Sequence, residues 1–158
     1  MKFEPHFVTF EQAILLFYKK FDAPCLNMYS PRKEVLNVHF MIWEDLICNS
    51  KIEEYLQTRK KLQFENPGSD YSPEYVCTAP EQWQVIDWLL KTYNLWIRVD
   101  HFVSNDGMVT WDYEIDKTGV GVHDPSYQRL VEFQEDRGFA TPQEAYSEAI
   151  TYILENLI

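Results

Sequence analysis

The chain has 158 residues, of which 46% are hydrophobic and 16% aromatic, a composition that supports a sizeable core and excludes the intrinsically disordered class. Its 25 acidic and 14 basic residues give a formal net charge of −11, and this negative field argues against direct binding of nucleic acid. The length fits a single domain spanning residues 1–158. The sequence holds no apolar run of about 18 residues, so we expect a cytoplasmic protein with no membrane segment.

The first third of the chain predicts a helix followed by a hairpin. Thr9 and Gln12 have the spacing of a capping box, in which each side chain accepts a hydrogen bond from the other residue's backbone N–H. They predict a helix over residues 10–21. Cys25–Tyr29 and Val35–Met41 then predict two short strands joined by a turn.

The segment from 42 to 70 is open between helix and loop. Ser50 and Glu53 have capping-box spacing and favour a short helix that ends in the basic run Arg59-Lys60-Lys61. Cations at the C-terminus of a helix compensate its dipole. We prefer this interpretation of the basic run to a phosphate-binding site.

The strongest local signals lie between Thr78 and Ile115 and predict an amphipathic helix that leads directly into a hairpin. Thr78 and Glu81 again have capping-box spacing, and an apolar face anchored by Trp83 follows at helical spacing. Asn94 favours the left-handed conformation that ends the helix.

The turn Asn105-Asp106-Gly107 fixes the register of this hairpin. A three-residue loop of this type places Val103 opposite Val109, and side chains then alternate between two faces along each strand. The inner face pairs His101 with Trp111, Val99 with Tyr113 and Ile97 with Ile115. The outer face pairs Phe102 with Thr110, Asp100 with Asp112, Arg98 with Glu114 and Trp96 with Asp116. We expect the inner face to lie in the core and the acidic outer face to be exposed.

The last third supplies one more strand and a helix. Tyr127–Phe133 is ambiguous, and its alternation favours a strand over a helix. Thr141, Pro142 and Glu144 mark the start of a C-terminal helix. The chain therefore predicts an α+β fold: an antiparallel sheet of two hairpins plus a fifth strand at Tyr127–Phe133, with three main helices packed on one face.

The sequence contains no recognised catalytic or metal-binding motif. Cys25, Cys48 and Cys77 are widely spaced and odd in number, which predicts reduced, buried thiols rather than a disulfide framework or a metal knuckle. The histidines never reach metal-ligand spacing, and His101 on the inner face is expected to be a core residue rather than a general base. We assign no catalytic residue and no cofactor.

A charge conflict on the outer face gives the one candidate site. Asp100 faces Asp112, with Glu114 beside it, and like charges directly across strands are destabilising. Trp96 and Phe102 add aromatic anchors, so this face fits a docking surface for a basic partner. The same carboxylates also fit a divalent cation. A third interpretation is that the neighbouring arginine and solvent, or a covering helix, relieve the repulsion.

Four stretches of the chain carry a family resemblance. They are EQAILLFYKKFDAPCLNMY, TAPEQWQVIDWLLKTYNL, WDYEI and FATPQEAYSEAITYILENLI. In this order they resemble small uncharacterised proteins of Bacteroidetes bacteria and their tailed phages. The resemblance implies no reaction, cofactor or catalytic residue.

The leading functional hypothesis is a non-catalytic cytoplasmic protein-interaction module, phage-encoded in line with the resemblance. It would bind a host protein through an acidic aromatic surface, and a homo-oligomer also fits such a surface. The residues of this surface are Trp96, Asp100, Phe102, Asp112 and Glu114. The alternative hypothesis is a metal-dependent enzyme that uses the carboxylates of the same sheet face.

Overall fold

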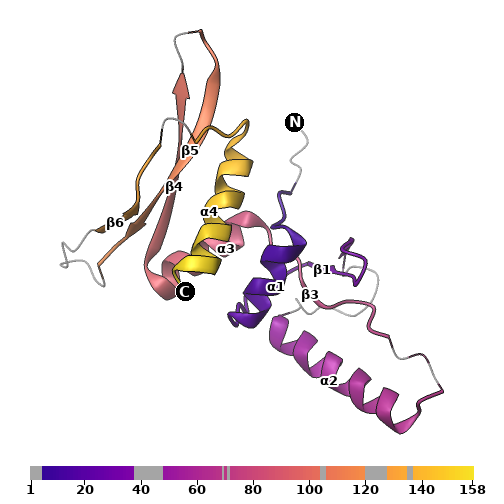
Figure 1. Cartoon of the computed structure of the whole chain (residues 1–158). Helices are drawn as coiled ribbons and strands as arrows, with labels where there is room; N and C mark the ends of the chain where they lie inside the picture. Colours follow the sequence, from indigo (N-terminus) through magenta and orange to yellow (C-terminus); the bar gives the residue numbers. More distant parts are fainter. Residues whose placement is uncertain are drawn as a thin grey trace. The chain divides into compact units, whose positions relative to one another are not determined.

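The structure, a computed structural model, describes residues 5–37, 48–68, 70, 72–103, 106–119, 128–134 and 137–158. These residues form four helices and two three-stranded antiparallel sheets, which confirms the α+β class (Figure 1). Contacts divide the chain into an N-terminal unit, Phe7–Glu81, and a C-terminal unit, Gln82–Ile158 with Met1–His6. The single domain spanning residues 1–158 stays a prediction.

The N-terminal unit holds two helices and a small sheet. Its elements are α1 (Phe10–Tyr18), β1 (Asn27–Tyr29), β2 (Val35–Asn37), α2 (Asn49–Glu65) and β3 (Cys77–Thr78). The Thr9–Gln12 capping box is present, and β1 pairs with β2 as an antiparallel hairpin, so both predictions are confirmed. The predicted second strand continued to Met41, and residues 38–41 lie outside the described part of the chain.

Strand β3, which the sequence did not predict, completes the order β2-β1-β3. It contains Thr78, so the predicted helix start at that residue is wrong. Instead, the backbone N–H and the hydroxyl of Thr78 both donate to Asn49 Oδ1, at 2.9 and 3.1 Å. Asn49 Nδ2 in turn donates to the carbonyl of Phe21 at 2.9 Å. Thr78 is therefore held in β3, opposite Met28, and not at the start of a helix.

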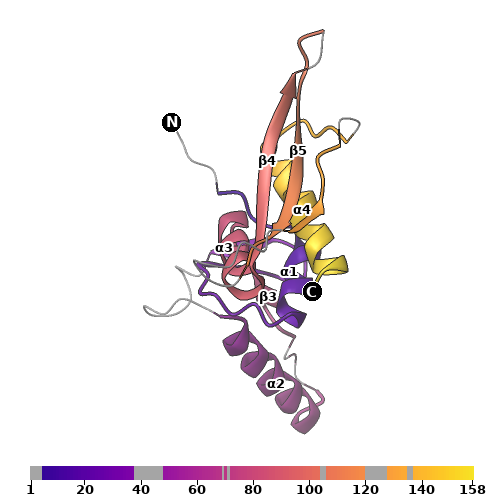
Figure 2. The ribbon, with the colours of Figure 1, turned by 90° about the vertical axis from the view of Figure 1, so that its left-hand side faces the viewer.

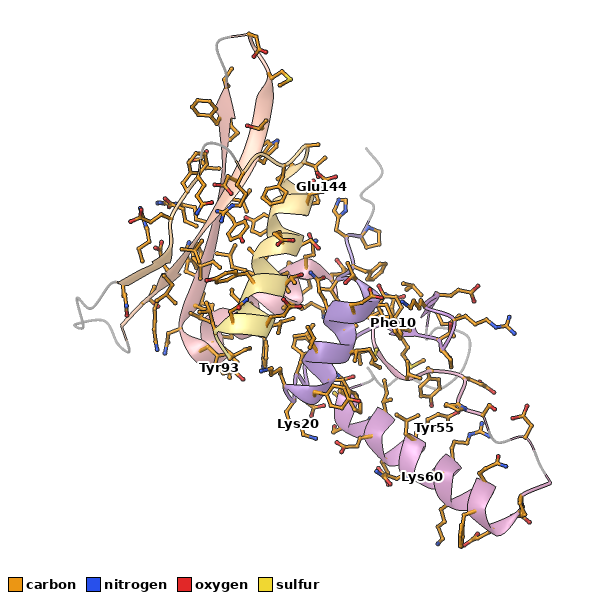
Figure 3. All side chains as sticks on the ribbon, viewed as in Figure 1. Phe10, Lys20, Tyr55, Lys60, Tyr93 and Glu144 are labelled. Carbon is orange, nitrogen blue, oxygen red and sulfur yellow. The ribbon has the colours of Figure 1, made fainter. Side chains whose placement is uncertain are left out.

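Helix α2 is longer than predicted and begins differently. The predicted Ser50 capping box is wrong, because Ser50 lies inside the helix and its N–H and hydroxyl donate to the carboxylate of Asp22, at 2.8 and 3.0 Å. The helix runs on to Glu65, past the basic run, so that run does not mark the helix end. Tyr55 and Lys60, both labelled in Figure 3, lie on α2, and the ring of Tyr55 stacks on Tyr75 with centroids 4.3 Å apart.

The described residues of the C-terminal unit form a second sheet and two helices. Its elements are α3 (Gln82–Tyr93), β4 (Leu95–Val103), β5 (Val109–Lys117), β6 (Gln128–Val131) and α4 (Pro142–Asn156). The sheet order is β4-β5-β6, with α3 and α4 packed against it (Figure 1). Strand β6 lies inside the predicted fifth strand. The single sheet with three helices on one face was wrong, because the first hairpin and α1 belong to a separate sheet and unit.

The predicted hairpin register is confirmed at every pair, from Val103 opposite Val109 to Trp96 opposite Asp116. Asn94 has a φ of 58°, the left-handed conformation expected at the end of α3. At the start of α4, Glu144 accepts hydrogen bonds from the backbone N–H groups of Thr141 and Ala140 (Figure 3). The C-terminal capping box is therefore also confirmed.

The inner face of the hairpin is buried only near its base. Ile97, Tyr113 and Ile115 are buried, whereas Val103 is 54% exposed and Val109 is 49% exposed. A nine-residue strand spans about 30 Å and the 15-residue helix α4 about 22 Å, so the far end of the hairpin extends beyond its cover (Figure 2). The expectation that the whole face points into the core is wrong at this end.

Two expectations for the contact between α3 and this hairpin face are also corrected. Trp83, the expected anchor of the helix, is exposed, and Val85 and Leu89 are the buried residues of α3. His101, expected in the core, has an exposed side chain that lies against Trp111 with ring centroids 5.5 Å apart. Periodicity assigns each residue to a face of its helix or strand but does not fix how deeply it is buried.

Burial of the hairpin base predicts a large stability difference along one face. Ile115→Ala should lower the free energy of unfolding by about 2–5 kcal/mol, because it leaves a cavity in a fully buried position. Val109→Ala, on the same face and strand, should cost less than about 1 kcal/mol. Urea denaturation of both variants measures the difference, and equal losses would contradict the burial described.

Candidate interaction surface and the arginine–carboxylate network

The structure divides the five predicted site residues into two groups. Trp96, Asp100 and Phe102 lie on β4 and are exposed, Trp96 by 46% and Phe102 by 38%. Asp112 and Glu114 lie on β5 and are only 2% and 9% exposed. The residues share one sheet face, as predicted, but the acidic members of β5 do not reach the surface.

The difference follows from the positions of the strands in the sheet. Strand β4 is at the edge of the β4-β5-β6 sheet, whereas β5 is the central strand. After β6, the chain continues along β5, where Phe139 and Trp111 exchange backbone hydrogen bonds of 2.8 and 2.9 Å. Among the described residues of β6 and the segment after it, Arg129, Gln134 and Arg137 contact the β5 carboxylates.

Arg137 neutralises Asp112. Its Nε donates to Asp112 Oδ1 at 2.5 Å, while the backbone N–H of Gln134 donates to Asp112 Oδ2 at 2.6 Å. The same guanidinium donates to the carbonyl oxygen of Tyr113 at 2.6 Å and lies over the Tyr113 ring, 3.9 Å from the centroid. Both oxygens of the buried carboxylate thus have a donor, which offsets the cost of removing its charge from water.

Two further arginines form ion pairs with the remaining carboxylates of β5. Arg129 places Nη1 3.1 Å from Glu114 Oε1 and Nε 3.2 Å from Asp116 Oδ1. Arg98, across the strand pair, contacts Glu114 Oε2. Three arginines therefore meet three buried carboxylates, and the repulsion predicted between Asp100 and Asp112 is relieved mainly from β6 and the segment after it.

This network leaves the β5 carboxylates engaged with guanidinium groups. Among the residues described, no group of three or more His, Cys, Asp or Glu side chains could hold a metal ion. What remains open is a hollow of about 350 Å³ whose lining includes Arg98, Asp100, Phe102 and Phe133. The lining also includes His101 and the carboxylates of Asp112 and Glu114, so the hollow has aromatic walls and more acidic than basic groups. Such a hollow is suited to contact with a protein side chain.

The thiols offer no further reactive centre in the described structure. Cys25 and Cys77 are buried, and burial raises the pKa of each to about 12. Burial also raises the pKa of Cys48, which is only partly buried. All three cysteines are free, as predicted, and the thiolate form needed for nucleophilic chemistry is disfavoured.

Comparison with protein-family models, with curated proteins and with solved structures finds no match to this chain. The resemblance to proteins of Bacteroidetes and their phages stays a prediction. None of the helices in the part of the chain that the structure describes combines the length and hydrophobicity needed to span a bilayer.

The network predicts that Arg137 has a large structural effect. Arg137→Met should lower the free energy of unfolding by about 3 kcal/mol or more, because it leaves the charge of Asp112 buried without its cation. Lys91→Met, which removes the exposed ion pair with Asp87, is the control and should cost less than about 1 kcal/mol. Chemical denaturation compares the two variants, and a small loss for Arg137→Met would show that the network is dispensable.

Burial of the thiols predicts an order of labelling. In native protein at pH 8, a thiolate-specific disulfide reagent should modify Cys48 first, because a thiol of pKa about 12 has about one thiolate in 10,000 molecules. Cys25 and Cys77 should react only after denaturant is added. Mass spectrometry of the labelled peptides gives the order, and rapid native labelling of Cys77 would contradict its burial.

Proposed function

We propose that this chain is a non-catalytic protein-interaction module whose contact surface is the β4 outer face, formed by Trp96, Arg98, Asp100 and Phe102. The observation that carries the proposal is that all four side chains are exposed in a row on one strand. Meanwhile the neighbouring carboxylates of β5 are buried against arginines. The four residues of this surface carry one positive and one negative charge, and the hollow beside them is also lined by Asp112 and Glu114.

The aromatic residues supply the free energy of such a contact. Trp96 and Phe102 expose large apolar areas to water, and burying them against a partner recovers the hydrophobic contribution. Trp is enriched among the residues that dominate binding energy. Arg98 and Asp100 lie between them and would fix the orientation of the partner through charged hydrogen bonds.

The proposed partner is a host protein in a cytoplasmic setting, in keeping with the resemblance to phage proteins. The net charge of −11 favours association with a protein that has a basic surface. The metal-dependent enzyme is less well supported, since the carboxylates that it would use are held by Arg129 and Arg137.

The test is capture of a host protein by the tagged chain at low salt, identification of the protein by mass spectrometry, and titration with the purified partner. Trp96→Ala combined with Phe102→Ala should weaken binding by about tenfold or more, the loss expected when aromatic anchors are truncated. Phe64→Ala is the control, because Phe64 is an aromatic residue on α2 that is 88% exposed. Failure to retain any partner, or equal binding by the double variant, would overturn the proposal.

A further inference from the structure

Among the described residues, strand β4 is an edge strand of the β4-β5-β6 sheet. Within residues 82–103, 106–119, 128–134 and 137–158, no strand pairs with the side of β4 that faces away from β5. The strand is nine residues long and contains no proline, lysine or bulge, which are features that protect an edge strand from pairing with another chain. Its charged residues, Arg98 and Asp100, are of opposite sign. In Figure 2, β4 lies to the left of β5.

The hydrogen-bond pattern shows which backbone groups lie at this edge. Trp111 directs its N–H and C=O toward Phe139, away from β4. Its partner His101 therefore directs its own N–H and C=O away from β5, since opposite residues in an antiparallel pair share this orientation. Because this orientation alternates along a strand, the backbone N–H and C=O groups of Leu95, Ile97, Val99 and Val103 also point away from β5.

The sequence of β4 is complementary to itself when two copies run antiparallel about Val99. In that register, Arg98 lies opposite Asp100 of the second copy, and Trp96 lies opposite Phe102. Both are non-hydrogen-bonded pairs, in which opposing side chains are closest. A parallel arrangement would instead place Arg98 against Arg98 and Asp100 against Asp100.

We propose that the chain forms a twofold-symmetric dimer in which two β4 edges pair antiparallel about Val99. The central pair is Val99 with Val99 of the second copy, flanked by Ile97 with His101 on both sides. In the single chain Asp100 accepts a hydrogen bond from the backbone N–H of His101 at 2.8 Å. In the dimer Asp100 pairs with Arg98 of the second copy, whose guanidinium also contacts Glu114 of its own chain, and the N–H of His101 becomes available to the ladder. The two β4 outer faces become one continuous surface, so the dimer is compatible with binding of a host protein.

This inference goes beyond the proposed function and is tested without any other partner. Sedimentation velocity over a range of protein concentrations should show a monomer–dimer equilibrium for the unmodified chain. Asp100→Arg should weaken dimerisation by about tenfold or more, because it places two arginines opposite each other at two symmetric positions. Asp87→Arg makes the same change in net charge on the exposed face of α3 and should leave the equilibrium unchanged.

A backbone variant keeps the test independent of side-chain charge. Val99→Pro removes an N–H that faces away from β5, so the hairpin ladder is retained while the central pair of the dimer is lost. Circular dichroism checks that the variant is folded. A monomer at every concentration, or a dimer that survives both Asp100→Arg and Val99→Pro, would overturn the inference. Neither result measures host-protein binding. Because Trp96 and Phe102 also lie opposite each other in the dimer, sedimentation of their double variant is compared with its titration against the host protein, which separates a loss of dimer from a loss of partner binding.

Discussion

The C-terminal unit depends on the pairing of three arginines with the carboxylates of its central strand. Strand β5 is buried on both faces, with Tyr113 and Ile115 on one side and Asp112 and Asp116 on the other. Burying carboxylates without partners would cost several kcal/mol for each ion. The guanidinium groups offset this cost. Their ion pairs also connect β4, β6 and the segment after β6 to the central strand β5.

The N-terminal unit uses distant polar partners in a similar way. Asn49 joins the start of α2 to β3 and to the carbonyl that follows α1, through hydrogen bonds to Thr78 and Phe21. Asp22 supplies the acceptors at the start of α2 that a local cap would otherwise provide. In both units, a few buried or bridging polar groups fix how elements far apart in the sequence are joined.

The features that the sequence predicted correctly are those decided within a few residues. The register of the β4–β5 hairpin follows from the turn, and the caps at Thr9 and Thr141 follow from local spacing. The capping boxes at Ser50 and Thr78 failed because Asp22 and Asn49, more than 25 residues away, engage their groups. Local spacing shows that a cap can form, but not whether a tertiary partner replaces it.

The burial of the hairpin faces was not predictable for a related reason. Alternation assigned Asp112 and Val103 to their faces correctly, but the depth of each position depends on what lies above it. Val103 lies beyond the helices, whereas Asp112 is covered by a segment that brings Arg137 from 25 residues later. The sequence placed Arg98 opposite Glu114 and Arg129 in the ambiguous strand, but it gave no signal that Arg137 would reach Asp112.

The asymmetry between β4 and β5 explains why a binding role belongs to β4. A central strand satisfies its backbone groups on both sides, and in β5 the carboxylates are already neutralised within the unit. An edge strand has an exposed face, which can bind a partner through side chains, and a row of unpaired backbone groups, which can pair with another strand. Because a strand's face and edge are perpendicular, a partner on the Trp96 and Phe102 face need not compete with a second copy at the edge. A sheet enlarged by edge pairing would instead present that partner with twice the aromatic surface.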